Sequence, residues 1–240
     1  MQISGKRVLI TGANRGLGQA LALAFVRAGA VEVFAGTRNV DALEASGSPK
    51  ITPIKLDVTS DEDVAAASRD VGRVDILINN AGIAVHGGVF KAAFDDIQSE
   101  IDINILGPLR VVRAFAPAMV EHGDGMIVNV SSQLGKVALP ASGTYCATKA
   151  ALLSLTQAMR GDLAHHGVRV VAVLPGAMDT DMTRNYAIPK TSPSKVADEI
   201  LEAIRTEPRE IAVSDDARKL LSDLAADPVA VEDALSQIRA

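Results

Sequence analysis

Short apolar runs alternate with longer amphipathic stretches along most of the 240-residue chain. The runs are rich in β-branched residues and show no strict alternation of apolar and polar positions, which is typical of parallel strands covered on both faces. Seven runs predict strands: Arg7–Thr11, Val31–Ala35, Ile51–Leu56, Val74–Ile78, Met126–Val130, Arg169–Leu174 and Glu210–Val213. Strands that alternate with helices predict an α/β fold, a doubly wound three-layer sandwich around a mostly parallel seven-stranded sheet.

The stretches between these runs carry apolar residues at helical spacing. Four helices are expected on this basis: Leu17–Ala28, Asp61–Val71, about Phe94–His122 and about Thr144–His166. Ser60 is a suitable N-cap for the second helix. Gly107-Pro108 interrupts the third, so we expect a kink there, because proline lacks the N–H of a regular helix.

The chain shows no internal repeat, low-complexity tract or interdomain linker, so residues 1–240 are expected to form one domain. Ala187–Ser194 contains two prolines and is expected to be a surface loop. The tail, about residues 215–240, is expected to form two short helices divided at Asp227-Pro228.

Composition narrows the possible partners and compartment. Hydrophobic residues make up 48% of the chain and charged residues 22%, which is enough apolar material for a sizeable core. The net charge of −5 gives no attraction to nucleic acid or an anionic membrane, and no apolar run approaches the ~20 residues that span a bilayer. The N-terminus lacks a signal peptide, and the single cysteine cannot form an internal disulfide. A cytoplasmic protein without nucleic-acid or membrane partners is expected.

A glycine-rich turn follows the first strand. Its sequence, Thr11-Gly12-Ala13-Asn14-Arg15-Gly16-Leu17-Gly18, ends where a helix begins. Glycines let the backbone turn sharply and approach a pyrophosphate, while the helix N-terminus presents free N–H groups to that anion. The alternative is a plain strand-to-helix turn. The strand before it and the helix after it favour a Rossmann-type dinucleotide site with six contacting residues: Gly12, Asn14, Arg15, Gly16, Leu17 and Gly18.

The end of the second strand bears on the choice of cofactor. An acidic side chain there would bind the free 2′-hydroxyl of NAD, but this chain has Gly36-Thr37-Arg38. Arg38 can pair with a 2′-phosphate, and Arg15 could add a second positive charge. The alternative is that both arginines are solvated surface residues. This chemistry favours NADP(H) over NAD(H).

Tyr145 and Lys149 are four residues apart, which puts both on one face of a helix. Free tyrosine has a pKa of about 10, and a nearby ammonium would lower it. Such a pair can transfer a proton while a nicotinamide cofactor transfers a hydride. Taken alone, the spacing also fits an ordinary helix face with one exposed lysine.

Several further motifs lie in register with these two. They are Asp57-Val58 after the third strand, Asn79-Asn80-Ala81-Gly82 after the fourth, Asn104, Ser131-Ser132, and Pro175-Gly176 with Thr180. With the glycine turn and the Tyr–Lys pair, they span about three-quarters of the chain. In this set and order, the chain resembles a single-domain short-chain dehydrogenase/reductase.

The resemblance implies catalytic roles. Ser132 would polarise a substrate carbonyl, while Ser131 would be structural. Tyr145 would donate the proton in reduction. Lys149 would bind the nicotinamide ribose and lower the pKa of the tyrosine. Asn104 would anchor a water molecule that links Lys149 to solvent.

The resemblance also implies further cofactor contacts. Asp57 would accept from the adenine amino group, although it could equally cap a turn, and Val58 would add a backbone contact. The remaining contacts fall in two groups, one along the adenosine and ribose path and one at the carboxamide: Asn80, Ala81 and Gly82, then Pro175, Gly176 and Thr180.

Substrate specificity is the least transferable property. The family's substrate-covering region would be about residues 176–192, and four residues are candidates to contact substrate: Leu134, Met178, Met182 and Tyr186. The leading hypothesis is an NADPH-dependent carbonyl reductase. The alternatives are an NAD-dependent alcohol dehydrogenase and a dinucleotide-binding protein without catalysis. The four histidines lack metal-ligand spacing, so no metal is expected. The resemblance further implies a homodimer or homotetramer assembled through the two long helices.

Overall fold

The computed structural model describes residues 1–41, 48–85 and 87–238. Within them, seven strands form one sheet in which all neighbouring strands are parallel, where a mostly parallel sheet was expected. The strands are β1 (Arg7–Thr11), β2 (Glu32–Thr37), β3 (Ile51–Lys55), β4 (Ile76–Asn79), β5 (Gly125–Val130), β6 (Val168–Pro175) and β7 (Glu210–Val213). Each of the seven predicted strands is confirmed, with ends that differ by at most two residues.

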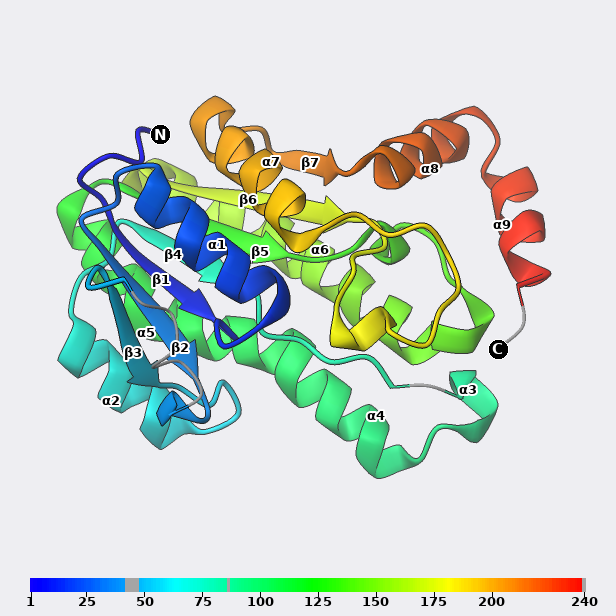
Figure 1. The fold of residues 1–240 in the computed structure, drawn as a ribbon, viewed down its shortest axis with the longest axis horizontal. Helices are drawn as coiled ribbons and strands as arrows, with labels where there is room; N and C mark the ends of the chain where they lie inside the picture. The colour runs from blue at the N-terminus through cyan, green and yellow to red at the C-terminus, as the bar shows by residue number, and fades with distance from the viewer. Residues whose placement is uncertain (42–47, 86, 239–240) are drawn as a thin grey trace.

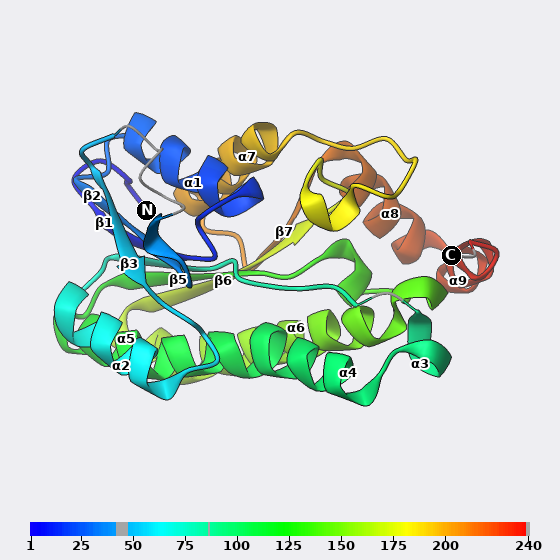
Figure 2. The ribbon, with the colours of Figure 1, turned by 60° about the horizontal axis from the view of Figure 1, so that its bottom comes forward.

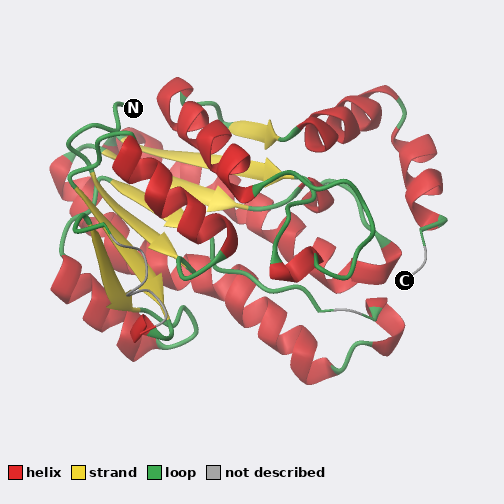
Figure 3. Ribbon diagram, viewed as in Figure 1, coloured by secondary structure: helices red, strands yellow, loops and turns green. Residues whose placement is uncertain are grey.

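The order of strands across the sheet is β3-β2-β1-β4-β5-β6-β7. The direction of winding therefore reverses between β1 and β4, and doubly wound sheets bind ligands in the crevice at the carboxyl ends of two such strands. Figure 3 shows the strands pointing towards one edge of the sheet, where the longer loops gather. The glycine-rich turn after β1 and the segment after β4 both lie at this edge.

Helices cover both faces of the sheet, which confirms the three-layer sandwich (Figures 1 and 2). On one face lie α1 (Gly16–Arg27) and α7 (Pro193–Thr206), and on the other lie α2 (Asp61–Val71), α5 (Gly107–His122) and α6 (Gly143–Leu163). Phe25 of α1 and Ile200 of α7 are buried in one core, and Phe115 of α5 is buried in the other. The expected N-cap is also present, since the Ser60 side chain accepts from the Asp63 N–H at 3.1 Å.

The long helix is continuous from Phe94 to His122, but its irregularity differs from the one expected. The chain passes from α4 (Phe94–Ile101) through a π-helical turn at Asp102–Leu106 into α5. Pro108 is the second residue of α5, so the irregular turn directly precedes Gly107-Pro108. This helix is long and apolar enough to cross a membrane by length and composition, yet it packs along the sheet with 44% of its most apolar stretch buried.

The C-terminal third departs from expectation at one point. The predicted loop Ala187–Ser194 ends early, because α7 begins at Pro193 and the Ser192 side chain accepts from the Lys195 N–H. A serine followed by proline and then by apolar residues at helical spacing is the signal that could have predicted this helix. The tail forms α8 (Asp215–Ala226) and α9 (Pro228–Ser236), and a short helix, α3 (Gly88–Lys91), follows β4.

Candidate active site

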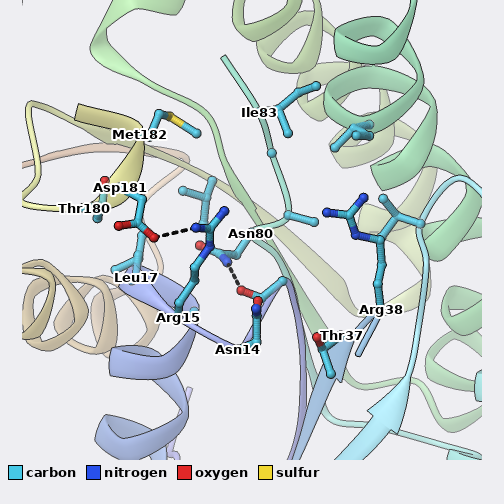
Figure 4. Close-up of a pocket in the computed structure, with 18 of the residues that line it drawn as sticks. Asn14, Arg15, Leu17, Thr37, Arg38, Asn80, Ile83, Thr180, Asp181 and Met182 are labelled. Carbon is cyan, nitrogen blue, oxygen red and sulfur yellow. Dashed lines mark hydrogen bonds and ion pairs between the residues drawn. The ribbon is translucent and has the colours of Figure 1, made fainter. Parts of the chain in front are cut away.

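A cavity of about 420 Å³ opens at the carboxyl edge of the sheet, where the winding reverses. Most of the residues predicted to bind cofactor or substrate line it (Figure 4). They are Gly12, Asn14, Arg15, Gly16, Leu17, Gly18, Thr37, Arg38, Asp57, Val58, Asn80, Ala81, Gly82, Tyr145, Lys149, Met178, Thr180 and Met182. Residues from six different segments of the chain thus meet at one cavity.

Six predicted residues do not line this cavity. Asn104 and Ser132 are buried beside it, where they hold groups that do line it. Pro175 is the last residue of β6, and Gly176 follows it. The other two are Leu134 and Tyr186, so of the four substrate candidates only the two methionines reach the cavity in this structure.

Gly12 and Gly18 of the glycine turn have no room for a side chain. Gly12 has φ +66°, and a Cβ there would lie 2.9 Å from the Cα of Ala81. A Cβ at Gly18 would lie 2.2 Å from the carbonyl oxygen of Gly12. Arg15 is the N-cap of α1 but its side chain does not cap the helix, and the first turn has no acidic residue. The cradle therefore fits a pyrophosphate, because the helix offers it backbone N–H groups and a partial positive charge.

Thr11 is a structural residue of the site that the sequence reasoning did not select. Its Oγ1 accepts from the backbone N–H groups of Asn80 and Ala81, at 3.0 Å each, which ties the end of β1 to the end of β4. In return, Asn80 Nδ2 donates to the carbonyl oxygens of Thr11 and Gly12 at 2.9 and 3.2 Å. The Asn80 amide thus supports the glycine turn. The sequence signal that could have identified Thr11 is a hydroxyl residue at the end of a strand, directly before the first glycine of the turn.

The two arginines proposed for NADP stand apart and have different surroundings (Figure 4). Arg38 is exposed just after β2, and its charge acts on Asp57. Arg15 instead forms an ion pair with Asp181 across the cavity, with 2.5 Å between Nη1 and Oδ2. Of the two arginines, Arg38 is thus the one placed where a 2′-phosphate was expected.

Asp57 is held in the turn after β3. Its Oδ1 accepts from the N–H and the hydroxyl of Thr59 at 2.9 and 2.7 Å, so it does cap a turn. Burial opposes its charge, but the Thr59 hydrogen bonds and the charges of Arg38 and Lys55 hold the pKa of Asp57 below its usual range. It remains an ionised acceptor that lines the cavity near neutral pH.

Tyr145 and Lys149 both lie on α6 and both line the cavity. Lys149 Nζ donates to the carbonyl oxygen of Val130 at 3.0 Å and lies 5.6 Å from the centroid of the Tyr145 ring. Burial raises the pKa of Tyr145 to about 12 and lowers the pKa of Lys149 to about 8. The expectation that Lys149 lowers the tyrosine pKa is not met in this structure, because desolvation dominates. A hydrogen bond with Ser132 opposes this rise in the Tyr145 pKa but offsets only part of it.

The two serines after β5 have different partners. Ser131 donates through Oγ to the carbonyl oxygen of Lys149 at 2.9 Å, which ties α6 to the end of β5. Ser132 accepts from the Leu134 N–H at 3.1 Å and forms the hydrogen bond with the Tyr145 hydroxyl.

Asn104 occupies the π-helical turn, where it is fully buried. Its Oδ1 accepts from the Ile83 N–H, and its Nδ2 donates to the Ile83 carbonyl and to Thr148 Oγ1, all at 2.9–3.0 Å. A Cβ on Gly82 would lie 3.2 Å from Asn104 Oδ1 and 3.4 Å from Lys149 Nζ. Asn104 therefore fixes the segment after β4 beside the lysine.

Comparison with known proteins gives the same family as the sequence motifs. A family model described as short chain dehydrogenase matches residues 6–190. The chain belongs to the short-chain dehydrogenase family. Its structure matches that of a short chain dehydrogenase from Burkholderia cenocepacia in complex with NADP with a TM-score of 0.94 and 38% identity, covering 99% of this chain and 100% of that one.

Two other relatives have names that state a reaction or a bound cofactor. The ketoacyl reductase HetN from Nostoc sp. is 34% identical over 229 residues, which cover 88% of this chain and 79% of HetN. A 3-oxoacyl-[acyl-carrier protein] reductase from Brucella melitensis with bound NAD superposes with a TM-score of 0.78 at 31% identity, covering 88% of this chain and 91% of that one. This short-chain dehydrogenase is thus an oxidoreductase with both NADP-bound and NAD-bound structural relatives. Among its described residues, no group of three or more His, Cys, Asp or Glu could hold a metal ion.

Proposed function

We propose that this protein reduces a ketone or aldehyde to an alcohol with NADPH. One observation carries the proposal: Tyr145, hydrogen-bonded to Ser132 and stacked near Lys149, opens on the same cavity as the glycine turn. A proton donor and a dinucleotide cradle that share one cavity are what paired hydride and proton transfer requires. The ketoacyl reductases among its relatives support reduction of a carbonyl.

The residues of the cavity fit a nicotinamide dinucleotide, which would supply the hydride. The side-chain-free cradle at Gly12 and Gly18 leaves room for a pyrophosphate. Asp57 and Val58 would face the adenine, and Gly82 and Lys149 the nicotinamide ribose. Thr180 lines the same cavity beyond Gly16, where the carboxamide would bind, and a Cβ on Gly16 would lie 3.4 Å from its Cγ2.

The proton chemistry follows from the pKa values of Tyr145 and Lys149. With a pKa of about 12, Tyr145 is protonated at neutral pH and can donate from Oη to a developing alkoxide. Ser132 would hold the same substrate oxygen, since its hydroxyl already bonds that of Tyr145. Lys149, with a pKa of about 8, is largely charged at neutral pH, and would hold the ribose and replace the proton that Tyr145 gives up.

The catalytic assignment can be tested with Tyr145→Phe, which removes the proton donor and leaves the ring. Purified protein with NADPH and a panel of apolar ketones and aldehydes should oxidise NADPH, followed by absorbance. The variant should lose at least about a thousandfold in kcat, in line with the loss of a general acid, and retain NADPH binding. Full activity in the variant would disprove the role of Tyr145.

The choice of cofactor depends on Arg38. Its exposed guanidinium at the end of β2 supports NADP(H), while a relative with bound NAD makes NAD(H) the competing possibility. Arg38→Ala should raise the KM for NADPH about tenfold and leave the KM for NADH within about twofold, because only NADPH carries the 2′-phosphate. Arg69→Ala, an exposed arginine on α2, is the matched control. A wild-type protein that prefers NADH would favour an NAD-dependent alcohol dehydrogenase instead.

We also propose a cytoplasmic homodimer or homotetramer. The helix Phe94–His122 is apolar but less than half buried along its most apolar stretch, and Phe94 at its start is 89% exposed. Burying such a face against a second copy would remove it from water. Light scattering at micromolar concentration should give at least twice the monomer mass of 25.0 kDa.

A further inference from the structure

The strands β6 and β7 end side by side, and the residues that follow them form a compact corner. Pro175 at the end of β6 is in register with Val213 at the end of β7. Gly176 and Ala177 continue from the first strand, and Ser214 and Asp216 from the second. The segment after Ala177 then enters the cavity with Met178, Thr180 and Met182.

Asp216 connects these two strand ends through its carboxylate. Its Oδ2 accepts from the Ala177 N–H at 2.8 Å, and its Oδ1 accepts from the Ser214 hydroxyl at 2.5 Å. Ser214 Oγ in turn accepts from the Gly176 N–H at 3.3 Å. Two successive N–H groups of the turn after β6 are thus bound by side chains from the turn after β7.

The backbone is tightly constrained on both sides of this corner, at Gly176 after β6 and at Ser214 after β7. A Cβ on Gly176 would lie 2.0 Å from Asp216 Oδ2, so the carboxylate fills the space that a side chain at Gly176 would need. Ser214 has φ +84°, a conformation that costs a residue other than glycine free energy and persists only where its surroundings impose it. Ser214 is fully buried, and its N–H donates to Glu199 Oε2 at 2.8 Å, which holds it from the side of α7.

We infer that Asp216 is a positioning residue of the cofactor site: it holds the Gly176-Ala177 backbone so that the following segment covers the nicotinamide half of the dinucleotide. The inference rests on the proposed function, because it assigns that half of the cofactor to the cavity wall formed by Met178 and Thr180. It also gives the C-terminal segment a part in the site, although the matched family region ends at residue 190.

The neighbouring aspartate separates this role from ordinary helix stabilisation. Asp215 and Asp216 both lie in the first turn of α8, where a negative charge favours the helix dipole. Asp215 bonds only to the exposed side chains of Arg218 and Lys195 among the described residues, and its own side chain is 82% exposed. Of these two aspartates, Asp216 is the one that bonds to the turn after β6. The pair therefore offers a matched control within one helical turn.

The test compares two ligands that share one end. NADPH should occupy the whole cavity, whereas adenosine 2′,5′-bisphosphate should occupy only the adenosine end, near Arg38. Titration calorimetry gives the dissociation constants of both for wild type, Asp216→Ala, Asp216→Asn and Asp215→Ala. Asp216→Ala should bind NADPH about tenfold more weakly and the bisphosphate within about twofold of wild type. Asp215→Ala should change neither, and Asp216→Asn, which keeps one acceptor oxygen, should recover part of the loss.

Several outcomes would overturn the inference. Equal weakening of both ligands in Asp216→Ala would show a general loss of structure, and unchanged NADPH binding would show that the corner has no influence on the cofactor. If Asp216→Ala does not fold, Ser214→Ala removes the hydroxyl that holds the carboxylate and must weaken NADPH selectively. A wild-type protein that binds NADPH but reduces no carbonyl would refute the reductase function alone. One that binds NADPH no more tightly than the bisphosphate would refute the positioning role.

Discussion

Lys149 should cost the protein stability, so that replacing it with methionine yields an inactive but more stable enzyme at neutral pH. The lysine is 4% exposed, and burial lowers its pKa from 10.5 to about 8. Below pH 8 the ammonium is charged in both the folded and the unfolded state, and the folded state alone bears its desolvation. Between pH 8 and 10.5 the unfolded chain binds more protons, so the stability of the wild type rises with pH across that window.

The magnitude follows from the same two pKa values. Their difference corresponds to about 3 kcal/mol of unfavourable free energy at pH 7. Methionine has a similar length and no charge, so Lys149→Met should recover this penalty. It also removes the donor to the Val130 carbonyl, which costs about 1 kcal/mol when a buried acceptor is left unpaired. The variant should therefore be about 2 kcal/mol more stable at pH 7 and about 1 kcal/mol less stable at pH 10.5.

Urea denaturation at pH 6, 7, 8, 9 and 10.5, followed by circular dichroism, measures this change of sign. Lys50→Met, at an exposed position, is the control and should stay within about 0.5 kcal/mol of wild type throughout. A Lys149→Met protein that is destabilised equally at all pH values would refute the reasoning, because its effect would then be packing rather than charge.

Two further predictions concern the residues that tie the cavity together. Thr11→Val removes the acceptor shared by the N–H groups of Asn80 and Ala81 and should lower the free energy of unfolding by about 2 to 3 kcal/mol, measured by urea denaturation; a loss below about 0.5 kcal/mol would contradict the bracing role. Asp181→Asn releases the exposed Arg15 and should change the free energy of unfolding by under about 1 kcal/mol. It should also tighten NADPH binding about threefold at low salt. Calorimetric titrations at higher salt should show a smaller gain, because salt screens the charge of Arg15. Weaker NADPH binding in this variant would mean that the ion pair holds the cofactor in place.

The sequence was sufficient for the strands of the sheet and for most of the residues that line the cavity. Buried parallel strands are continuous apolar runs, so all seven could be predicted, but their order, which brings the ends of β1 and β4 together, was not predicted. Helical spacing placed Tyr145 and Lys149 on one face of a helix, but their proposed roles came from the resemblance to short-chain dehydrogenases. These features depend on local patterns.

Features that depend on contacts between distant segments could not be predicted from the sequence. The direction of Arg15 is set by Asp181, 166 residues along the chain, and the Asn80 amide turns to the glycine loop because Thr11 lies beside it. The tyrosine pKa depends on how deeply the ring is buried, which spacing does not reveal. Ser214 has a conformation that its residue type disfavours, so only the structure shows the corner it forms with Asp216.

The π-helical turn at Asp102–Leu106 has a consequence for how the long helix tolerates change in length. Such a turn amounts to one residue more than a regular helix would use over the same rise, and each residue of an α-helix rotates the chain by about 100°. Because the π-helical turn takes up its extra residue locally, removing one residue here would restore a regular helix and leave the faces of α4 and α5 as they are, whereas a deletion elsewhere in the helix would rotate one part by about 100°. The loss would instead fall on Asn104, which could no longer meet both backbone groups of Ile83. The extra residue thus leaves the packing of the long helix unchanged and places Asn104 beside the lysine.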